Sequence, residues 1–116
     1  MELAERLAQS GTRLVTTRAV LLEIGNALAK LRYRDAALQL LEALETDPQV
    51  AIVPLTDTLH RRAFDLYRSR PDKEWGLTDC ASFVLMRERG LTEALAANEH
   101  FRQAGFSALL LDGSNP

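Results

Sequence analysis

The sequence contains a single cysteine, Cys80, among its 116 residues. One cysteine excludes an internal disulfide framework and a zinc site built from several cysteines, and it is typical of a protein of the reducing cytoplasm. Long apolar runs are absent too, since no segment approaches the roughly 18 residues that cross a bilayer. The first ten residues carry Glu2 and Glu5 and have no apolar stretch of signal-peptide length. We therefore expect a soluble, cytoplasmic protein that makes no contact with a membrane.

An excess of positive charge is also absent, because 14 Lys and Arg face 16 Asp and Glu, for a net charge of -2. A strongly basic composition is the usual sign of a nucleic-acid-binding surface, so any basic surface here must be local. Interleaved carboxylates such as Asp35, Asp65 and Asp72 favour an ordinary solvated helix face over such a surface. The candidates for a local basic rim are Lys30, Arg32, Tyr33, Arg34, Arg61, Arg62, Arg68 and Arg70.

The chain has enough apolar residues to bury a core. Apolar residues make up 47% of the sequence and charged residues 26%, and both shares are close to globular averages. A length of 116 residues corresponds to one domain. We therefore expect a single domain that spans residues 1–116.

Helical and strand patterns alternate along the chain. Helices are predicted over 1–9, 19–31, 34–45, 58–69, from 78 or 79 to 89, and over 98–103. Strands are predicted over 14–17, 50–53, 91–97 and 106–111. Strands that are separated by helices cannot pair as hairpins, so the economical fold is α/β, a parallel sheet with helices on both faces.

Three residues stand where a ligand site is expected in such a fold. Ligands gather at the carboxyl ends of the strands, and Glu23, Asp79 and Asn98 follow strands or begin helices. Converging carboxylates suit Mg²⁺, which prefers hard oxygen ligands. Each residue also has a simpler role, since Asp79 and Asn98 are ordinary N-cap residues and Glu23 could be a solvated flank residue.

Five segments of the sequence carry a resemblance to a known family: 15–17, VTT, 22–28, LEIGNAL, 61–63, RRA, 72–83, DKEWGLTDCASF, and 98–106, NEHFRQAGF. Together they resemble a PIN domain of the VapC-type toxin group, most densely over 73–83 and 98–106. The resemblance covers nearly the whole chain. It implies a compact three-layer α/β/α ribonuclease fold in which Mg²⁺ or Mn²⁺, held by acidic residues, activates water to cut RNA. It also implies a small antitoxin as partner.

The resemblance assigns roles residue by residue. Glu23 matches the helix glutamate of the family and Asp79 its helix-start aspartate, with Thr78 as a hydrogen-bonding companion. Asn98 stands at the last acidic position, where its carbonyl can ligate a metal but carries no charge. Glu23, Asp79 and Asn98 are thus the expected catalytic and metal-binding residues.

The chain departs from the family at its beginning. A PIN domain starts with a strand bearing an aspartate that is followed at two residues by Ser or Thr, and nothing before Leu14 has that form. We therefore expect the first, central strand to be missing, so that the strands at 14–17 and 91–97 flank an open position. Unpaired strand edges invite pairing with another chain, which makes a homodimer an expected outcome. A start codon assigned too far downstream would explain the same departure.

With only two of the family's four acids in place, we expect weak metal binding and weak or no cleavage of RNA. The prediction is a metal-dependent endoribonuclease toxin of a toxin-antitoxin pair with an incomplete acidic site. The alternative is a non-catalytic remnant that still binds an antitoxin or a like subunit.

Overall fold

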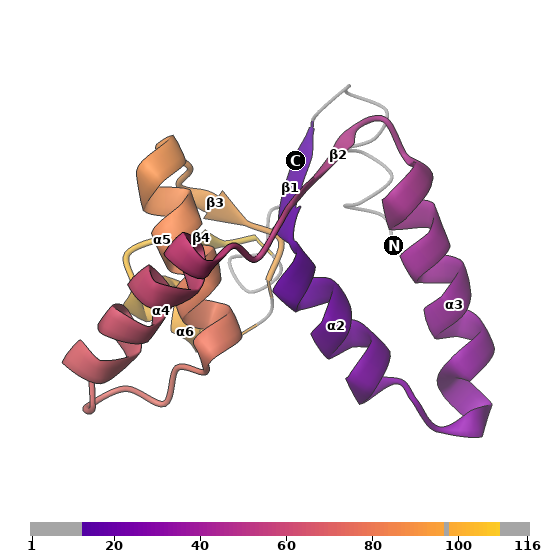
Figure 1. Cartoon of the computed structure of the whole chain (residues 1–116), viewed down its shortest axis with the longest axis horizontal. Coiled ribbons are helices and arrows are strands. Elements are labelled where there is room, and N and C mark those ends of the chain that lie inside the picture. Colours follow the sequence, from indigo (N-terminus) through magenta and orange to yellow (C-terminus); the bar gives the residue numbers. More distant parts are fainter. Residues whose placement is uncertain (1–12, 97, 110–116) are drawn as a thin grey trace. The chain divides into compact units, whose positions relative to one another are not determined.

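A computed structural model describes residues 13–96 and 98–109 of the chain. The residues group into two compact units, Met1–Leu55 and Thr56–Pro116, and each unit is described by itself (Figure 1). The helix predicted over 1–9 lies outside the described residues, and the single domain predicted over 1–116 stays a prediction. Within the described residues, no helix has the length and apolar character needed to span a membrane.

The N-terminal unit is a strand, two helices and a second strand. In chain order these are β1 Leu14–Thr17, α2 Arg18–Ala27, α3 Leu31–Thr46 and β2 Val50–Val53. The strands pair in parallel, with Leu14 opposite Val50 and Thr17 opposite Val53. Figure 1 shows the two strands side by side and α2 and α3 as a helical hairpin. Both strands match the predicted ranges.

Thr17 joins β1 to α2 without a loop. Its backbone is extended, at φ -110° and ψ 157°, and its Oγ1 accepts a hydrogen bond of 3.2 Å from the Val20 N–H. Threonine is a good N-cap because this bond satisfies one of the free N–H groups of the first helical turn. The side chain is buried, with 1% of its surface exposed.

The helix boundaries of this unit differ from the predicted ones. Helix α2 ends at Ala27 rather than at residue 31, because the chain turns at 28–30 and Leu31 begins α3 instead. Leu31 is 93% exposed and Leu38 is also exposed, so neither contributes to the core. Ala37 is buried, and an ion pair between Arg18 and Glu45 links the start of α2 to the end of α3.

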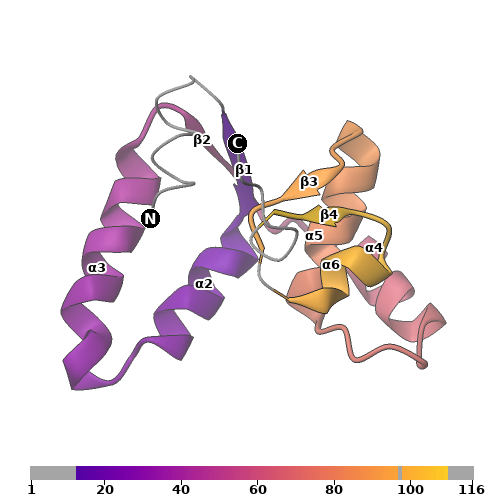
Figure 2. The ribbon, with the colours of Figure 1, turned by 180° about the vertical axis from the view of Figure 1, so that it is seen from behind.

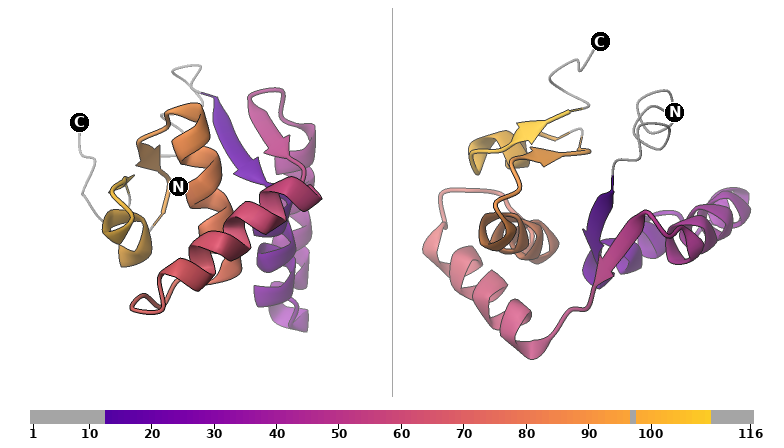
Figure 3. Two further views of the ribbon diagram at one scale, coloured as in Figure 1. Left: turned by 60° about the vertical axis from the view of Figure 1, so that its left-hand side comes forward. Right: turned by 90° about the horizontal axis from the view of Figure 1, so that it is seen from above.

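The C-terminal unit contains three helices and two very short strands. They are α4 Asp57–Ser69, α5 Leu77–Arg89, β3 Glu93–Ala94, α6 Glu99–Gln103 and β4 Ser107–Ala108. Helix α4 crosses α5, and β3 lies parallel to β4 (Figure 3). Figure 2 shows α6 and β4 together beside α5. Among the described residues, β3 and β4 are shorter than the predicted ranges 91–97 and 106–111. The hydrogen bonds that flank them run from the Ser107 N–H to the Thr92 carbonyl and from the Leu109 N–H to the Ala94 carbonyl.

The core of the C-terminal unit is built around Phe83. The Phe83 ring is fully buried and meets the Trp75 and Phe101 rings edge-on, with centroids 5.0 Å and 4.8 Å away. Edge-on aromatic pairs are favourable beyond the area they bury. Cys80 is also fully buried, which confirms that it packs as a small apolar residue. The other buried apolar residues of this unit are Leu59, Ala63, Ala81, Leu85, Met86 and Ala108.

Helix α5 ends as the sequence predicts. Gly90 follows Arg89 with φ +66°, in the left-handed region, where a residue with a Cβ is strained. The Leu91 N–H then donates to the Met86 carbonyl at 2.8 Å, which satisfies one of the last helical carbonyls. The α/β class is thus confirmed, with a short parallel sheet in each unit among the described residues. The missing central strand stays a prediction.

Candidate functional site

Asp79 is held at the N-terminus of α5. Gly76 is the N-cap and Asp79 the third helical residue, so the prediction that Thr78 or Asp79 caps this helix is wrong by two or three residues. Asp79 Oδ2 accepts a hydrogen bond of 3.1 Å from the Gly76 N–H. This carboxylate-to-cap bond is half of a capping box, and the positive end of the helix dipole stabilises the negative charge.

His100 contacts the same carboxylate oxygen from α6. Its Nδ1 lies 3.0 Å from Asp79 Oδ2, and the two side chains are 30% and 20% exposed. The sequence reasoning missed this pair, because the residues are 21 positions apart and no local pattern joins them. The one signal was the position of His100 inside the 98–106 segment that carries the family resemblance.

Asn98 is the N-cap of α6, as its simpler interpretation predicts. Its Oδ1 accepts a hydrogen bond of 3.1 Å from the His100 N–H. His100 therefore contacts Asn98 through its backbone and Asp79 through its ring. One residue thus brings two of the three predicted ligands together at the same end of the unit.

Glu23 and Thr78, the other two predicted site residues, are not linked to Asp79 and Asn98 in the way that His100 is. Glu23 lies on α2 in the N-terminal unit and is exposed, and its convergence with Asp79 and Asn98 stays a prediction because it joins the two units. Thr78 is half-buried in the first turn of α5, directly before Asp79. Its role as a companion of Asp79 also stays a prediction.

The donor chemistry of the C-terminal unit suits a hard cation. Asp79 offers a carboxylate and Asn98 an amide carbonyl, and Mg²⁺ often binds through one or two carboxylates plus water and substrate phosphate. Among the described residues, no group of three or more His, Cys, Asp or Glu could hold a metal ion. The donors therefore fit Mg²⁺ or Mn²⁺ in kind, but they are few.

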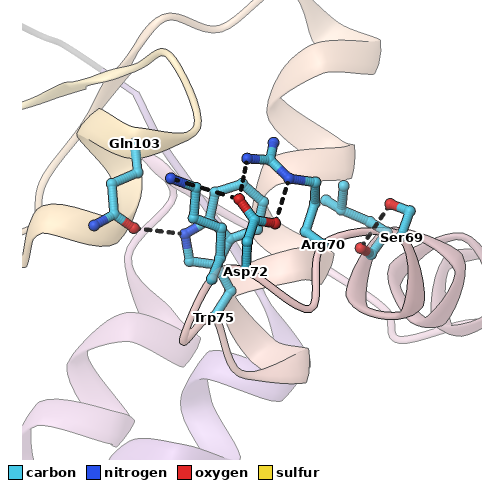
Figure 4. Close-up of polar contacts among 7 residues, drawn as sticks. Ser69, Arg70, Asp72, Trp75 and Gln103 are labelled. Atoms are coloured by element: carbon cyan, nitrogen blue, oxygen red, sulfur yellow. Dashed lines mark hydrogen bonds and ion pairs between the residues drawn. The ribbon is translucent and has the colours of Figure 1, made fainter.

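Two side-chain contacts hold the loop before α5, residues 70–76, one near each end of the loop (Figure 4). Arg70 donates from Nε and Nη2 to the two carboxylate oxygens of Asp72, both at 3.0 Å, and this hydrogen bonding lowers the pKa of Asp72 to about 2. The Trp75 Nε1–H donates to Gln103 Oε1 at 3.0 Å. Trp75 is almost fully buried, which confirms that it anchors this loop.

Cys80 follows Asp79 in α5 and is a buried, free cysteine. Burial raises the pKa of the Cys80 thiol, and the negative charge of Asp79 adds to the effect. A thiol needs its thiolate form to react. The environment of Cys80 therefore favours the unreactive form.

Comparison with known proteins identifies the family. Residues 1–107 match the family described as PIN domain. Among solved structures, the chain is similar to VapC20 of Mycobacterium tuberculosis, described as a toxin that cleaves the sarcin-ricin loop, with a TM-score of 0.78 and 27% identity over 90% of this chain and 81% of that one. The curated proteins gave no match. A match that covers all but the last residues of the sequence is decisive, and the chain belongs to the PIN domain family.

Proposed function

We propose that this protein is a metal-dependent endoribonuclease of the toxin type whose acidic site is incomplete, so that it cleaves RNA weakly. One observation carries the proposal: within a PIN domain, the His100 ring contacts the Asp79 carboxylate at the start of α5, and the His100 N–H donates to Asn98, the N-cap of α6. The similarity to VapC20, a toxin that cleaves the sarcin-ricin loop, supports RNA as the substrate.

Asp79, Asn98 and Glu23 are the residues that would hold Mg²⁺ or Mn²⁺. The bound metal would polarise a phosphate oxygen and lower the pKa of a water for attack on phosphorus. The chain itself positions the main ligand, because both hydrogen bonds that the described residues make to the Asp79 carboxylate fall on Oδ2. The other oxygen, Oδ1, is therefore the atom of Asp79 that we assign to the metal.

The proposed site is incomplete because it lacks negative charge. Asn98 has a neutral side chain where the family resemblance expects an acid. Removing one negative charge beside a dication costs a few kcal/mol of attraction at an effective dielectric constant of about 20. Metal affinity, and with it the rate of cleavage, should be low.

A second candidate function is the binding of a protein partner without catalysis, in the manner of an antitoxin-binding remnant. The exposed apolar side chains of α2 and α3 favour it, because exposed apolar groups that lie on neighbouring elements commonly mark an interaction surface. They are Leu22, Leu31, Leu38 and Leu40. A cognate antitoxin is compatible with both candidates, and a homodimer stays a prediction.

Cleavage and metal binding separate the two candidates. The wild type and Asp79→Asn should be incubated with a mixed RNA pool in Mg²⁺ or Mn²⁺, and Mn²⁺ binding should be followed by electron paramagnetic resonance. We expect slow cleavage that Asp79→Asn abolishes. Asp65→Asn is the matched control, because Asp65 is an exposed carboxylate on α4. No Mn²⁺ binding and no cleavage by the wild type would contradict the nuclease and favour the protein-binding function.

A further inference from the structure

We propose that a groove between the C-terminal half of α4 and the loop before α5 binds single-stranded RNA and leads it to Asp79. The groove has a volume of about 720 Å³, and its lining runs from Phe64 to Leu77. The proposal rests on the proposed function and adds to it the surface that holds the substrate beyond the cleavage site.

Two aromatic rings of α4 supply flat surfaces in this groove. Phe64 and Tyr67 both line it, and 40% and 47% of their surfaces are exposed. Their rings are nearly parallel, at 17°, with centroids 6.5 Å apart. Exposed aromatic rings beside cationic groups are the usual platform for single-stranded nucleic acid, since every base has a π-face that can stack.

Positive charge surrounds these rings. Arg68, Arg70 and Lys73 line the groove, and Glu74 is the one carboxylate among its lining residues, in a chain whose net charge is -2. The Arg68 guanidinium lies 4.7 Å above the centre of the Phe64 ring, and within residues 13–96 and 98–109 it has no carboxylate partner. Arg70 and Lys73 both form ion pairs with Asp72, so Arg68 is the stronger candidate for a phosphate contact.

The groove reaches the start of α5, next to the proposed cleavage site. Gly76 and Leu77 line the groove, and the Gly76 N–H donates to Asp79 Oδ2. Trp75, another lining residue, is held in place, because its Nε1–H donates to Gln103 and the Arg70 guanidinium lies 5.2 Å above the centre of its ring (Figure 4). Lining residues that are already held in place reduce the ordering cost of binding. RNA that lies along Tyr67 and Arg68 would therefore reach the first turn of α5.

The binding of RNA can be measured without cleavage. A fluorescently labelled ten-nucleotide RNA is titrated with the wild-type protein in EDTA at low salt, and its anisotropy is recorded. We expect Tyr67→Ala to weaken binding about ten-fold, since it removes one stacking surface, and Tyr67→Phe to retain it. We expect Arg68→Gln to weaken binding and to reduce the slope of log affinity against log salt by about 0.7.

The chain offers a matched control. Tyr33 is exposed on α3, and the Arg32 guanidinium lies 4.7 Å above the centre of its ring, so this pair repeats the chemistry of the groove outside it. Tyr33 and Arg32 belong to the other group of basic-rim candidates, on α3. Because the groove proposal places RNA at Tyr67 instead, Tyr33→Ala should leave RNA binding unchanged. Equal losses in Tyr33→Ala and Tyr67→Ala would overturn the proposal.

Two further results separate this proposal from its rivals. RNA binding in EDTA needs no metal ion, so failure of the nuclease proposal and failure of the groove proposal give different results. A wild type that does not cleave RNA, together with weaker RNA binding by Tyr67→Ala, would contradict the nuclease proposal alone, whereas cleavage by the wild type with unchanged RNA binding by Tyr67→Ala would contradict the groove proposal alone. If Tyr67→Ala instead lowers the mass in light scattering and leaves RNA affinity unchanged, the groove is a contact between copies of the chain and the RNA proposal is wrong.

Discussion

His100 Nδ1 lies 3.0 Å from Asp79 Oδ2 and joins α6 to the first turn of α5. In the metal site that we propose, the residue that contacts this carboxylate would determine which of its oxygens is left for the ion, as hydrogen-bonding partners orient metal ligands in other proteins. The two side chains are in contact although the residues are 21 positions apart in the sequence. Loss of this contact would therefore show that the proposed site is not formed.

We expect His100→Ala to weaken Mn²⁺ binding about ten-fold, because Asp79 loses the partner that fixes its rotamer. His100→Asn should keep most of the affinity, since its amide can replace the Nδ1 contact. Electron paramagnetic resonance of Mn²⁺ measures this without any cleavage. His60→Ala, an exposed histidine on α4, is the control and should bind as the wild type does. Equal affinity in His100→Ala would show that His100 does not position the ligand.

The Arg70–Asp72 pair predicts an acid titration. The pKa of Asp72 is lowered from 3.8 to about 2 by its hydrogen bonds to Arg70. A lowered pKa in the folded state means that the pair stabilises the fold above pH 3.8 and that this contribution is lost as the pH falls towards about 2. Carbon NMR of the Asp72 carboxyl should give that midpoint. In Arg70→Gln the midpoint should move up towards 3.8, and an unchanged midpoint would contradict the assignment of its cause.

Burial of Cys80 predicts a protected thiol. Its pKa is raised by burial and by the charge of Asp79, so the folded state favours the protonated form. This contribution to stability is present below the ordinary thiol pKa and is lost as the pH rises through the raised one. Iodoacetamide should modify Cys80 much more slowly in the native protein than in urea, as measured by mass spectrometry. Fast modification of the native protein would show that the helix opens at this point.

We expect substitution of Phe83 to cause the largest loss of stability in the C-terminal unit. Phe83→Ala removes a fully buried ring that contacts Trp75, Phe101 and Phe106, and the free energy of unfolding should fall by about 3–5 kcal/mol. Phe83→Leu should lose less. Urea denaturation measures both, and Leu31→Ala is the control, because Leu31 is 93% exposed and should change stability by less than about 0.5 kcal/mol. A similar loss in both alanine variants would show that Phe83 is not the centre of this core.

The sequence predicts the local structure well where a single residue decides it. Strand β2 occupies the predicted residues, Gly90 ends α5 in the left-handed conformation, and Asn98 caps α6. These outcomes depend on side-chain and backbone chemistry within a few residues.

Contacts between distant segments could not be predicted in the same way. The Asp79–His100 contact joins residues 21 positions apart, and nothing in the periodicity of either helix marks it. Strands β3 and β4 are short because their pairing is limited to a few backbone groups, which composition does not reveal. Tyr67 lies on the apolar side of the amphipathic pattern of α4 and is nevertheless exposed. The periodicity of a helix does not show how far a neighbouring element extends over its apolar side.

Thr17 is both the last residue of β1 and the N-cap of α2, so no connecting residue separates the strand from the helix. The direction of every α2 side chain is therefore fixed relative to β1. Inserting one residue after Thr17 would turn α2 by about 100° relative to the strand and carry Glu23 to a different side of the helix. Thr17, six positions before Glu23, thus sets the direction of the Glu23 side chain. An insertion or deletion between β1 and α2 would redirect it without changing any of the residues that we propose to bind the metal.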